Sequence, residues 1–396
     1  MPNKLLINVS PIRMPLTGIG YYTLNILTEL LTRNIDVVGI HNGKVISRDD
    51  LAILAANFSN TSEVASPAKS TKRFVIELLR SVPGVYQLKN KLLAIRSKSK
   101  LKKLAEAGYV YFEPSFVPFE YLGKTITTIH DLSFLSHPDF HPSTRVAYLT
   151  DKMNSTISNS DHIVVDSNFI LDELHQFYPA SKDKSSVLYL GAANSFQHLQ
   201  ECECDALLKT LNLNYSGFLL SVATLEPRKN LGKLIGAFKQ LPSDLRSRYP
   251  LVLVGDQGWK NSELLQSARE LVECNQVVFT GYVSDDDLKR LYASAAIFVY
   301  PSLYEGFGLP VIEAMASGIP VITSNVGATA EVAGSGALLV DPLNEHAISD
   351  AILELIQYPD NQSELIDNGM QRAAVFNWSA TVDQLLKIAS ATSRSA

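Results

Sequence analysis

Short runs of apolar residues alternate along the chain with longer stretches whose apolar positions recur every three or four residues. The short runs predict buried strands, and the longer period predicts helices that cover them. The first predicted helix, Gly18–Thr32, directly follows the first predicted strand. The predicted strands of the first half are Lys4–Val9, Ile35–Ile40, Tyr109–Phe112, Thr125–His130, Ile163–Asp166 and Val187–Leu190.

The alternation resumes after Asn194–Asp205, a polar and acidic stretch without a strand period. The predicted strands of the second half are Phe218–Ala223, Leu251–Val254, Val277–Thr280, Ile297–Tyr300, Val321–Thr323 and Leu338–Val340. The predicted helices of this half are Asn230–Gln240, Asp285–Ala295, Glu345–Gln357, Gln362–Phe376 and Ala380–Ala391.

Regular alternation of strand and helix is typical of α/β domains with parallel sheets. We predict two doubly wound, Rossmann-like domains, residues 1–200 and 201–378, followed by a helical segment, 379–396, that can pack back on the first domain. A ligand is expected in the cleft between the domains, at the carboxyl ends of the strands.

Size and composition agree with two soluble domains. The chain has 396 residues, 46% of them hydrophobic, and no apolar run long enough to cross a bilayer. Its N-terminus lacks the features of a signal peptide, so we expect a cytoplasmic protein. The three cysteines form no metal-ligand pattern and are expected to be reduced thiols. A net charge of −5 argues against a nucleic-acid partner.

One strongly basic segment departs from this mildly acidic average. From Lys69 to Lys103 the sequence contains eleven Lys or Arg residues and one acidic residue, Glu77, with apolar residues at helical spacing. Such a segment suits an anionic membrane surface, and would place the protein peripherally at the inner face of the membrane. A solvated helical face explains the pattern equally well.

The segment Tyr304-Glu305-Gly306-Phe307-Gly308-Leu309-Pro310, with Glu313 shortly after it, joins a predicted strand to a predicted helix. The helix begins near Pro310, where the missing proline N–H has no cost. The free N–H groups and the dipole of such a glycine-rich helix N-terminus suit a phosphate. The two carboxylates can each accept hydrogen bonds from neighbouring sugar or ribose hydroxyls. The segment therefore suits a nucleotide joined to a sugar.

A second segment, Glu226-Pro227-Arg228-Lys229-Asn230, follows the strand Phe218–Ala223. Arg can grip a phosphate through two parallel N–H donors, and Lys adds a compact charge. Cations at a helix N-terminus oppose the helix dipole, and a bound anion removes that conflict. A surface pair without a ligand is the alternative interpretation.

Together, the segment 226–230 and the carboxylates Glu305 and Glu313, eight residues apart, resemble the retaining glycosyltransferases of family 4, which have the GT-B fold. The resemblance covers nearly the whole chain and is most specific over 218–342. It implies that Glu305 holds sugar hydroxyls, Glu313 the ribose diol, and Arg228 with Lys229 the diphosphate. The remaining implied donor-binding residues are Gly255, Gly281, Val283, Gly306, Phe307, Gly308 and Leu309.

In the first domain, the segment from Pro15 to Thr23 resembles the short glycine loop of the same family, which lets the backbone approach the donor diphosphate. Gly18 and Gly20 are the candidate residues, although a tight turn explains them equally well. The full dinucleotide fingerprint fails, because Thr23 stands where its third glycine would be.

His130 ends a predicted strand at the cleft edge. A lone histidine there is more often packed or capping, but its place at the carboxyl edge favours a function. In the family, the matching histidine contacts the donor sugar near the reacting carbon, so His130 is a candidate catalytic residue. The run from Thr128 to Phe134 resembles bacterial mannosyltransferases of surface-polysaccharide (O-antigen) assembly. Arg145 is expected to be solvent-exposed, with a contact to acceptor or phosphate as the alternative.

Asp285 and Asp287 superficially form the Asp-x-Asp pair with which another glycosyltransferase fold binds a metal. Ser284 instead predicts the N-cap of a helix whose first turn is acidic. We expect neither a metal nor another cofactor.

The resemblance implies a metal-independent, retaining transfer of a hexose. We expect mannose to move from GDP-mannose onto a hydroxyl of a lipid-linked or growing polysaccharide. Double displacement needs a carboxylate nucleophile that the sequence does not place, so front-face attack is favoured. Three alternatives stay open: a sugar-nucleotide 2-epimerase, which would release a free epimerised sugar; a pyridoxal-phosphate phosphorylase, which would absorb visible light; and a non-catalytic nucleotide-binding scaffold.

Overall fold

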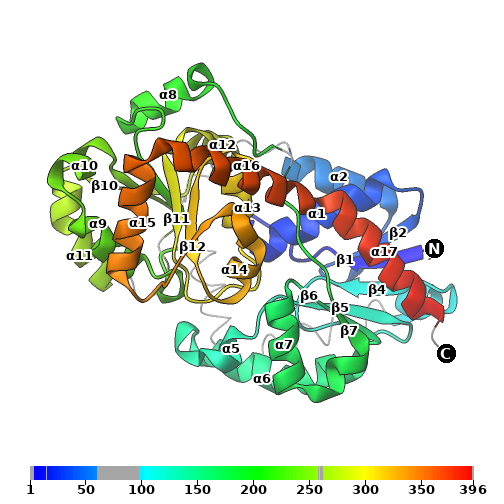
Figure 1. The fold of residues 1–396 in the computed structure, drawn as a ribbon. Helices are drawn as coiled ribbons and strands as arrows, with labels where there is room; N and C mark the ends of the chain where they lie inside the picture. Colours follow the sequence, from blue (N-terminus) through cyan, green and yellow to red (C-terminus); the bar gives the residue numbers. More distant parts are fainter. Residues whose placement is uncertain are drawn as a thin grey trace, which may run out of the picture.

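The computed structural model of the protein describes residues 4–14, 16–59, 98–193, 195–256, 258 and 262–394. Figure 1 shows two sheets in separate halves of the molecule, each flanked by helices. The two doubly wound domains predicted from the alternation of strands and helices are confirmed.

The N-terminal sheet has the order β3-β2-β1-β4-β5-β6-β7, and all its pairings are parallel except that of β2 with β3. Its strands are β1 (Lys4–Asn8), β2 (Asp36–His41), β3 (Lys44–Ile46), β4 (Val110–Glu113), β5 (Thr125–Ile129), β6 (His162–Val165) and β7 (Ser185–Val187). Its helices are α1 (Gly18–Thr32), α2 (Arg48–Ser59), α5 (Ser133–Ser136), η1 (Pro138–Phe140), α6 (Ser143–Asn159), α7 (Asn168–Phe177) and η2 (Pro179–Lys184).

The C-terminal sheet is parallel, with the order β10-β9-β8-β11-β12-β13. Its strands are β8 (Leu219–Val222), β9 (Leu251–Val254), β10 (Val277–Gly281), β11 (Ile297–Tyr300), β12 (Val321–Ser324) and β13 (Leu338–Val340). The helices of this half are α8 (Glu201–Leu211), η3 (Pro227–Lys229), α9 (Leu231–Gln240), α10 (Ser243–Arg248), α11 (Ser262–Glu273), α12 (Asp285–Ser294), α13 (Leu309–Ala316), α14 (Gly327–Ala333), η4 (Gly334–Gly336), α15 (Glu345–Gln357) and α16 (Pro359–Val375).

In each sheet the strand order reverses once, between β1 and β4 and between β8 and β11. In doubly wound sheets, ligands bind outside the carboxyl ends of the strands at this switch point. The segments that leave β1, β8 and β11 are the start of α1, the short helix η3 and the loop from β11 to α13. These are the three segments that carry most of the predicted site residues.

One predicted strand is misplaced. The apolar run Val187–Leu190 predicts a strand, but β7 covers Ser185–Val187 and the chain leaves the sheet after it. Leu188 and Leu190 are buried all the same, because they pack in the core between the sheet and the C-terminal helix. Their apolar character therefore reflects burial in this core, although the backbone N–H of Leu188 still donates to the Val165 carbonyl of β6 at 2.8 Å.

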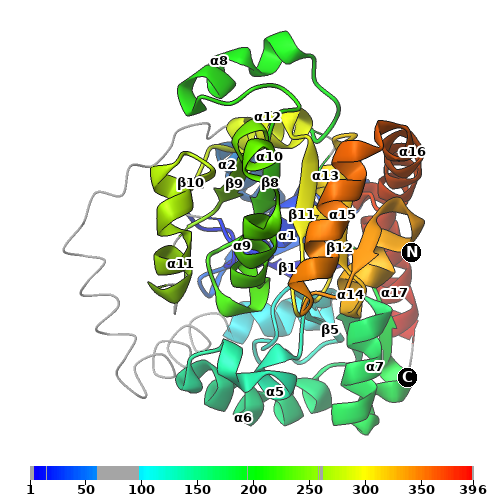
Figure 2. The ribbon, with the colours of Figure 1, turned by 60° about the vertical axis from the view of Figure 1, so that its left-hand side comes forward.

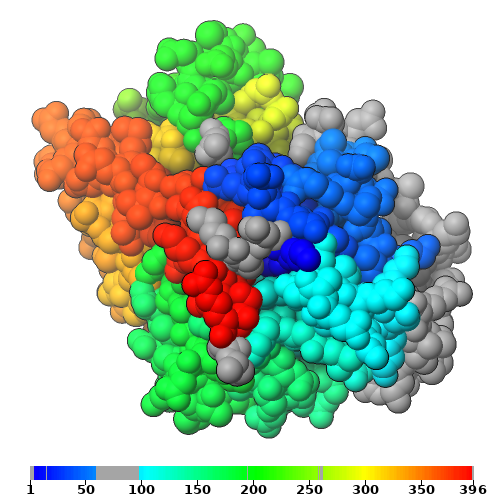
Figure 3. Space-filling model, turned by 90° about the vertical axis from the view of Figure 1, so that its right-hand side faces the viewer, coloured from blue at the N-terminus to red at the C-terminus, as the bar shows by residue number. Residues whose placement is uncertain are grey.

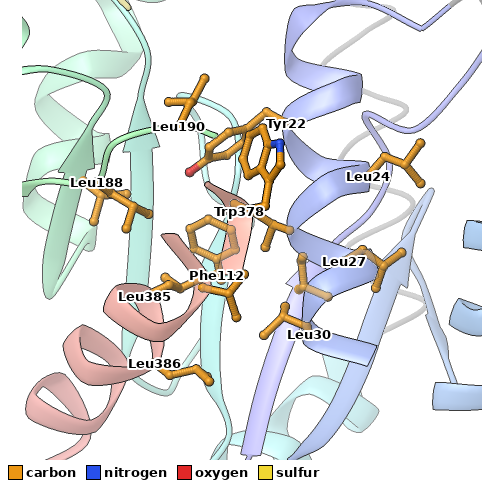
Figure 4. Close-up of a cluster of buried hydrophobic side chains, with 14 of the residues drawn as sticks. Tyr22, Leu24, Leu27, Leu30, Phe112, Leu188, Leu190, Trp378, Leu385 and Leu386 are labelled. Carbon is orange, nitrogen blue, oxygen red and sulfur yellow. The ribbon is translucent and has the colours of Figure 1, made fainter. Parts of the chain in front are cut away.

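The last helix, α17 (Trp378–Arg394), lies on the N-terminal domain. The chain crosses over after α16, and Ala192 pairs with Asn377 where the two connecting segments meet. Figure 4 shows Trp378, Leu385 and Leu386 of α17 packed among side chains of α1 and β4. In Figure 3 the red C-terminal segment lies against the blue and cyan N-terminal ones. The chain thus begins and ends in the same domain.

Most of the basic segment, residues 69–97, lies outside the described residues. Its last part is described: residues 98–106 are helical, with Leu101 buried and Lys102 and Lys103 exposed. Among the residues that the structure describes, none of the helices combines the length and the apolarity that a membrane crossing requires.

The packing of α17 yields a stability prediction. Leu385 is fully buried at 0% exposure, so Leu385→Ala should lower the free energy of unfolding by about 2–5 kcal/mol through lost burial and a residual cavity. Lys387→Ala, on the exposed face of the same helix, should change it by less than about 0.5 kcal/mol. Denaturant unfolding of both variants measures the difference. Equal stability of the two would mean that α17 is not part of the N-terminal core.

Candidate active site

A buried carboxylate, Glu305, organises the site. It lies between β11 and α13 and is 8% exposed. Its Oε2 accepts a hydrogen bond from Arg228 (2.6 Å) and its Oε1 one from Lys229 (2.6 Å). Oε1 also accepts from the hydroxyls of Tyr300 (2.8 Å) and Ser302 (2.6 Å). The predicted cations and the predicted carboxylate therefore meet in one ion-pair network.

The backbone conformation after β8 explains how the two cations reach this carboxylate. Pro227 fixes the start of the short helix η3, and Asn230 ends it in the left-handed region, with φ of 59°. The amide of Asn230 donates to the carbonyl oxygens of Pro301 (2.9 Å) and Pro342 (2.7 Å). Asparagine tolerates this conformation better than most residues. Through these hydrogen bonds, Asn230 links the turn that carries Arg228 and Lys229 to the loop that carries Glu305.

Charge sets the ionisation of the network. Burial alone would raise the pKa of Glu305, but the charges of Arg228 and Lys229 and their hydrogen bonds outweigh it and lower that pKa to about 2. Burial, and the nearby Arg228, lower the pKa of Lys229. Glu226 pairs with the other terminal nitrogen of Arg228 at 2.9 Å. Two cations and two carboxylates therefore balance within this network.

Both cations keep donors that could meet a further anion. Arg228 has five N–H groups, of which three bond to Glu226, Glu305 and the carbonyl of Tyr304 in the described structure. Lys229 has three, of which two bond to Tyr300 and Glu305. The network can therefore contact phosphate oxygens without breaking its internal pairs.

Glu313, on α13, is the second predicted carboxylate of the site. It accepts a hydrogen bond from Tyr292 at 3.0 Å. Burial, and the charge of Asp285, raise its pKa to about 7, although the Tyr292 bond lowers it. Asp285 accepts a hydrogen bond from Tyr21 of the N-terminal domain at 2.7 Å. Hydroxyl groups of a ligand would donate to the Glu313 carboxylate and favour its charged form.

The loop between Glu305 and α13 is held by the N-terminal domain. A Cβ on Gly306 would lie 2.0 Å from the carbonyl oxygen of His130, so only glycine fits there. Ser167 donates to the Gly306 carbonyl at 2.8 Å. Phe307 is buried in the N-terminal core, 5.4 Å from the ring of Phe376. The side chain of Phe307 is therefore structural, and only its backbone can contribute to a cradle.

Two helix N-termini face the expected ligand without side-chain caps. Gly308, with φ of 112°, is the N-cap of α13, and Leu309 is its first residue. Gly20 and Gly18 lie in the first turn of α1, whose N-cap Thr17 makes no side-chain capping bond. A Cβ on Gly18 would meet nothing within 4 Å. Uncapped N–H groups at such positions are suited to a phosphate.

Gly255, which follows β9, and Gly281, which ends β10, form a pair. The N–H of Gly255 donates to the carbonyl of Gly281 at 3.0 Å. A Cβ on Gly255 would lie 2.1 Å from the Ala223 carbonyl oxygen, whereas one on Gly281 would meet nothing within 4 Å. Gly255 is thus needed for close packing, while Gly281 leaves open space. Val283 packs at the edge of the adjoining core.

His130 is held on both ring nitrogens. Nδ1 lies 2.8 Å from Asp166 and Nε2 lies 2.8 Å from the carbonyl oxygen of Pro114. Both partners are acceptors, so both nitrogens donate and the ring carries a positive charge. Burial alone would lower the pKa of His130, but the Asp166 charge and these bonds raise it. The ring has no nitrogen left for a ligand in this conformation, so its influence on one would be through its charge.

The interpretation of Ser284 as a helix cap is confirmed. Its hydroxyl accepts the N–H of Asp287 at 3.1 Å, at the start of α12. Asp287 pairs with Arg290 at 3.2 Å, and Asp285 with Tyr21. Within the described ranges, no three His, Cys, Asp or Glu side chains gather closely enough to hold a metal ion.

Several polar groups of the site were not among the predicted residues: Glu226, Tyr292, Tyr300 and Ser302 around the carboxylates, and Asp166 beside His130. The signal for Tyr300 and Ser302 was present, since both flank the end of a strand whose loop was singled out. Asp166, which ends the predicted strand Ile163–Asp166, had a comparable position. Their hydrogen bonds to Glu305 and His130 depend on tertiary contacts, which the sequence pattern does not reveal.

Two facing Rossmann-like domains, with paired carboxylates and a glycine-rich loop at their switch points, define a GT-B glycosyltransferase. Residues 209–372 match the family Glycosyl transferases group 1. The chain is 31% identical to O-antigen chain mannosyltransferase B of Escherichia coli, over 97% of this chain and 98% of that protein. The chain belongs to the group 1 glycosyltransferases.

One further relative agrees with this assignment, and one solved structure agrees with the fold. The chain is 29% identical to O-antigen chain mannosyltransferase RfbU of Salmonella typhimurium, over 95% of this chain and 99% of that protein. Anabaena HepE, solved in complex with UDP, has a TM-score of 0.70 and 19% identity, over 98% of this chain and 100% of that one. The second likeness concerns the fold alone.

The ionisation of Glu305 yields a pH prediction. The pKa of Glu305 in the folded protein, about 2, lies below the ordinary glutamate value of about 4.3. The ionised carboxylate therefore contributes fully to stability above about pH 4.3, and this contribution is lost as the pH falls toward 2. Glu305→Gln should lower the free energy of unfolding by about 3 kcal/mol at neutral pH. The gap between wild type and variant should close in acid, as denaturant unfolding at a series of pH values would show.

The control is Glu345→Gln, which removes a half-exposed partner of Lys233 and should cost less than about 1 kcal/mol. A gap between wild type and Glu305→Gln that stays constant across this pH range would contradict the proposed charge network.

Proposed function

We propose that the protein is a mannosyltransferase that transfers mannose from GDP-mannose to a hydroxyl of a lipid-linked or growing polysaccharide in the cytoplasm. The observation that carries the proposal is the similarity to O-antigen chain mannosyltransferase B over nearly the full length of both chains. A second O-antigen chain mannosyltransferase, also matched almost end to end, supports the same substrate class.

In this proposal, different residues of the site bind different parts of the nucleotide-sugar donor. The unused donors of Arg228 and Lys229 bind the diphosphate, together with the backbone N–H groups at Gly18, Gly20 and the start of α13. Glu305 accepts from sugar hydroxyls through the lone pair of Oε2 that Arg228 leaves free. Glu313 accepts from the ribose diol.

Transfer would proceed with retention and without a metal. The bond between the anomeric carbon and the phosphate oxygen breaks as the acceptor oxygen approaches the same face. The departing phosphate oxygen takes the acceptor proton, while Arg228, Lys229 and the helix N-termini stabilise the negative charge that develops on the diphosphate. The positive charge of His130 lies behind the Gly306 loop, where it can add to this stabilisation.

Donor use tests the proposal. The protein is incubated with a panel of nucleotide sugars in EDTA, without acceptor, and binding and slow hydrolysis are measured. Saturable binding and turnover of GDP-mannose in preference to the other donors is the expected result. With an acceptor present, NMR of the product should show the anomeric configuration of the donor. Preference for a uridine nucleotide would overturn the proposed donor. Strict dependence on added metal would overturn metal independence, and inversion of the anomeric configuration would overturn retention.

We also propose that the basic segment from Lys69 to Lys103 binds an anionic membrane surface, where a lipid-linked acceptor would be found. Co-flotation with anionic vesicles should occur at low salt and decrease at high salt, because the attraction is screened. Vesicles of neutral lipid are the control. Absence of salt-sensitive flotation would favour a solvated helical face instead.

A further inference from the structure

A second histidine of the N-terminal domain, His141, belongs to a hydrogen-bonded chain beside the site. The hydroxyl of Ser133 donates to Asp131 Oδ1 at 2.6 Å, and His141 Nε2 lies 2.6 Å from the same hydroxyl oxygen. Asp131 directly follows His130 at the end of β5, and Ser133 is fully buried. The chain therefore runs from the cleft edge of the sheet to the start of α6.

Hydrogen-bond arithmetic fixes the tautomer of His141. A serine hydroxyl has a single hydrogen, and here it is directed at the Asp131 carboxylate. In the short contact between His141 and Ser133, the Nε2–H group of His141 must therefore be the donor and the hydroxyl oxygen of Ser133 the acceptor. In the neutral ring this leaves Nδ1 as a lone-pair acceptor. None of the described residues forms a hydrogen bond with Nδ1 of His141. This atom is not fully buried either, so it is accessible to solvent.

The surroundings of His141 connect it with the C-terminal domain. In both Figure 1 and Figure 2, α5 and α6 lie below that domain. The charges that act on the ring are those of Asp131 after β5, Arg145 on α6, and Glu226 and Arg228 at η3. Burial, then Arg145, lower the pKa of His141, while Asp131 and Glu226 offset part of the effect. The ring is therefore neutral at neutral pH, close to the cations proposed to bind the donor.

We propose that His141 and Arg145 form an acceptor subsite for the hydroxyl-rich end of a saccharide. Nδ1 of His141 accepts a hydrogen bond from one acceptor hydroxyl, and the exposed guanidinium of Arg145 donates to the oxygen of a neighbouring one. Ser133 and Asp131 position the ring by holding its proton on Nε2. The subsite rests on the proposed transferase function, and extends it to the acceptor side of the cleft.

Steady-state kinetics with varied acceptor tests the subsite. His141→Ala should raise the acceptor KM about five- to tenfold, the usual effect of one lost hydrogen bond, with a smaller change in kcat. Donor hydrolysis without acceptor should be unchanged. In the wild type, the acceptor KM should rise when the pH falls below the pKa of His141, which burial holds below the ordinary imidazole value of about 6.5, because protonation removes the acceptor lone pair. In His141→Ala that pH dependence should be absent.

Two amide variants separate substrate binding from a structural role. His141→Gln can still donate to Ser133 through an amide placed like Nε2, but has no acceptor in place of Nδ1. His141→Asn places an amide oxygen near the position of Nδ1 and loses the bond to Ser133. If His141 binds the acceptor, Asn restores part of the affinity and Gln does not. Recovery by Gln alone would assign His141 a structural role and overturn the subsite.

The matched control is His175→Ala. His175 also contacts a serine, Ser185, at 2.8 Å, but at the amino end of β7, the opposite edge of the sheet from the cleft. This variant should leave the acceptor KM unchanged. If the wild type turns over no GDP-mannose, the proposed donor is wrong, and the subsite is tested with the nucleotide sugar that the protein does use. An unchanged acceptor KM in His141→Ala, with active donor turnover, refutes the subsite alone.

Discussion

The pairing of Glu305 with Arg228 and Lys229 is the interaction on which the site depends. Removing one partner from such a buried network is far more costly than the network is stabilising, because an uncompensated charge remains in a poorly solvated place. The network also joins two loops, those that follow β8 and β11, at the switch point of the C-terminal sheet. A change in either loop therefore displaces the charges that would face a diphosphate, and the geometry of the site follows from the fold of both.

The same loop is also fixed to the other domain. The hydroxyl of Tyr304 accepts the N–H of Leu132 at 3.1 Å and donates to Glu173, while Gly306 lies directly against the backbone of His130. A further contact between the domains, the hydrogen bond from Tyr21 to Asp285, joins α1 to α12. The loop that carries Glu305 is therefore held by both domains, and its position depends on how they pack together.

The sequence predicts helices and strands with a clear period well, but it predicts poorly which side chains bond to each other. The helix Gly18–Thr32 is found with the predicted bounds, because a long amphipathic period leaves little ambiguity. The small strand β3 was missed, although the Asn42-Gly43 pair before it has the positive φ values of a two-residue hairpin and is its usual signal. Glu305 and Arg228 could be selected because each lies in a short motif. Asp166 could not be assigned to His130, because a contact across 36 residues depends on the parallel pairing of β5 with β6.

The two histidines on either side of α5 show how partners determine the chemistry of one residue type. His130 faces two acceptors, a carboxylate and a carbonyl, so both nitrogens must hold protons and the ring is a cation. His141 faces a hydroxyl whose hydrogen is already committed, and cations lie nearby, so the ring donates once and stays neutral. In the proposed reaction, a positive ring would suit the developing phosphate charge, and a neutral ring with a free lone pair would suit the uncharged hydroxyls of a glycan. Asp131 lies between them in the sequence and is bonded to Ser133, so its charge supports the cation of one histidine and the proton position of the other.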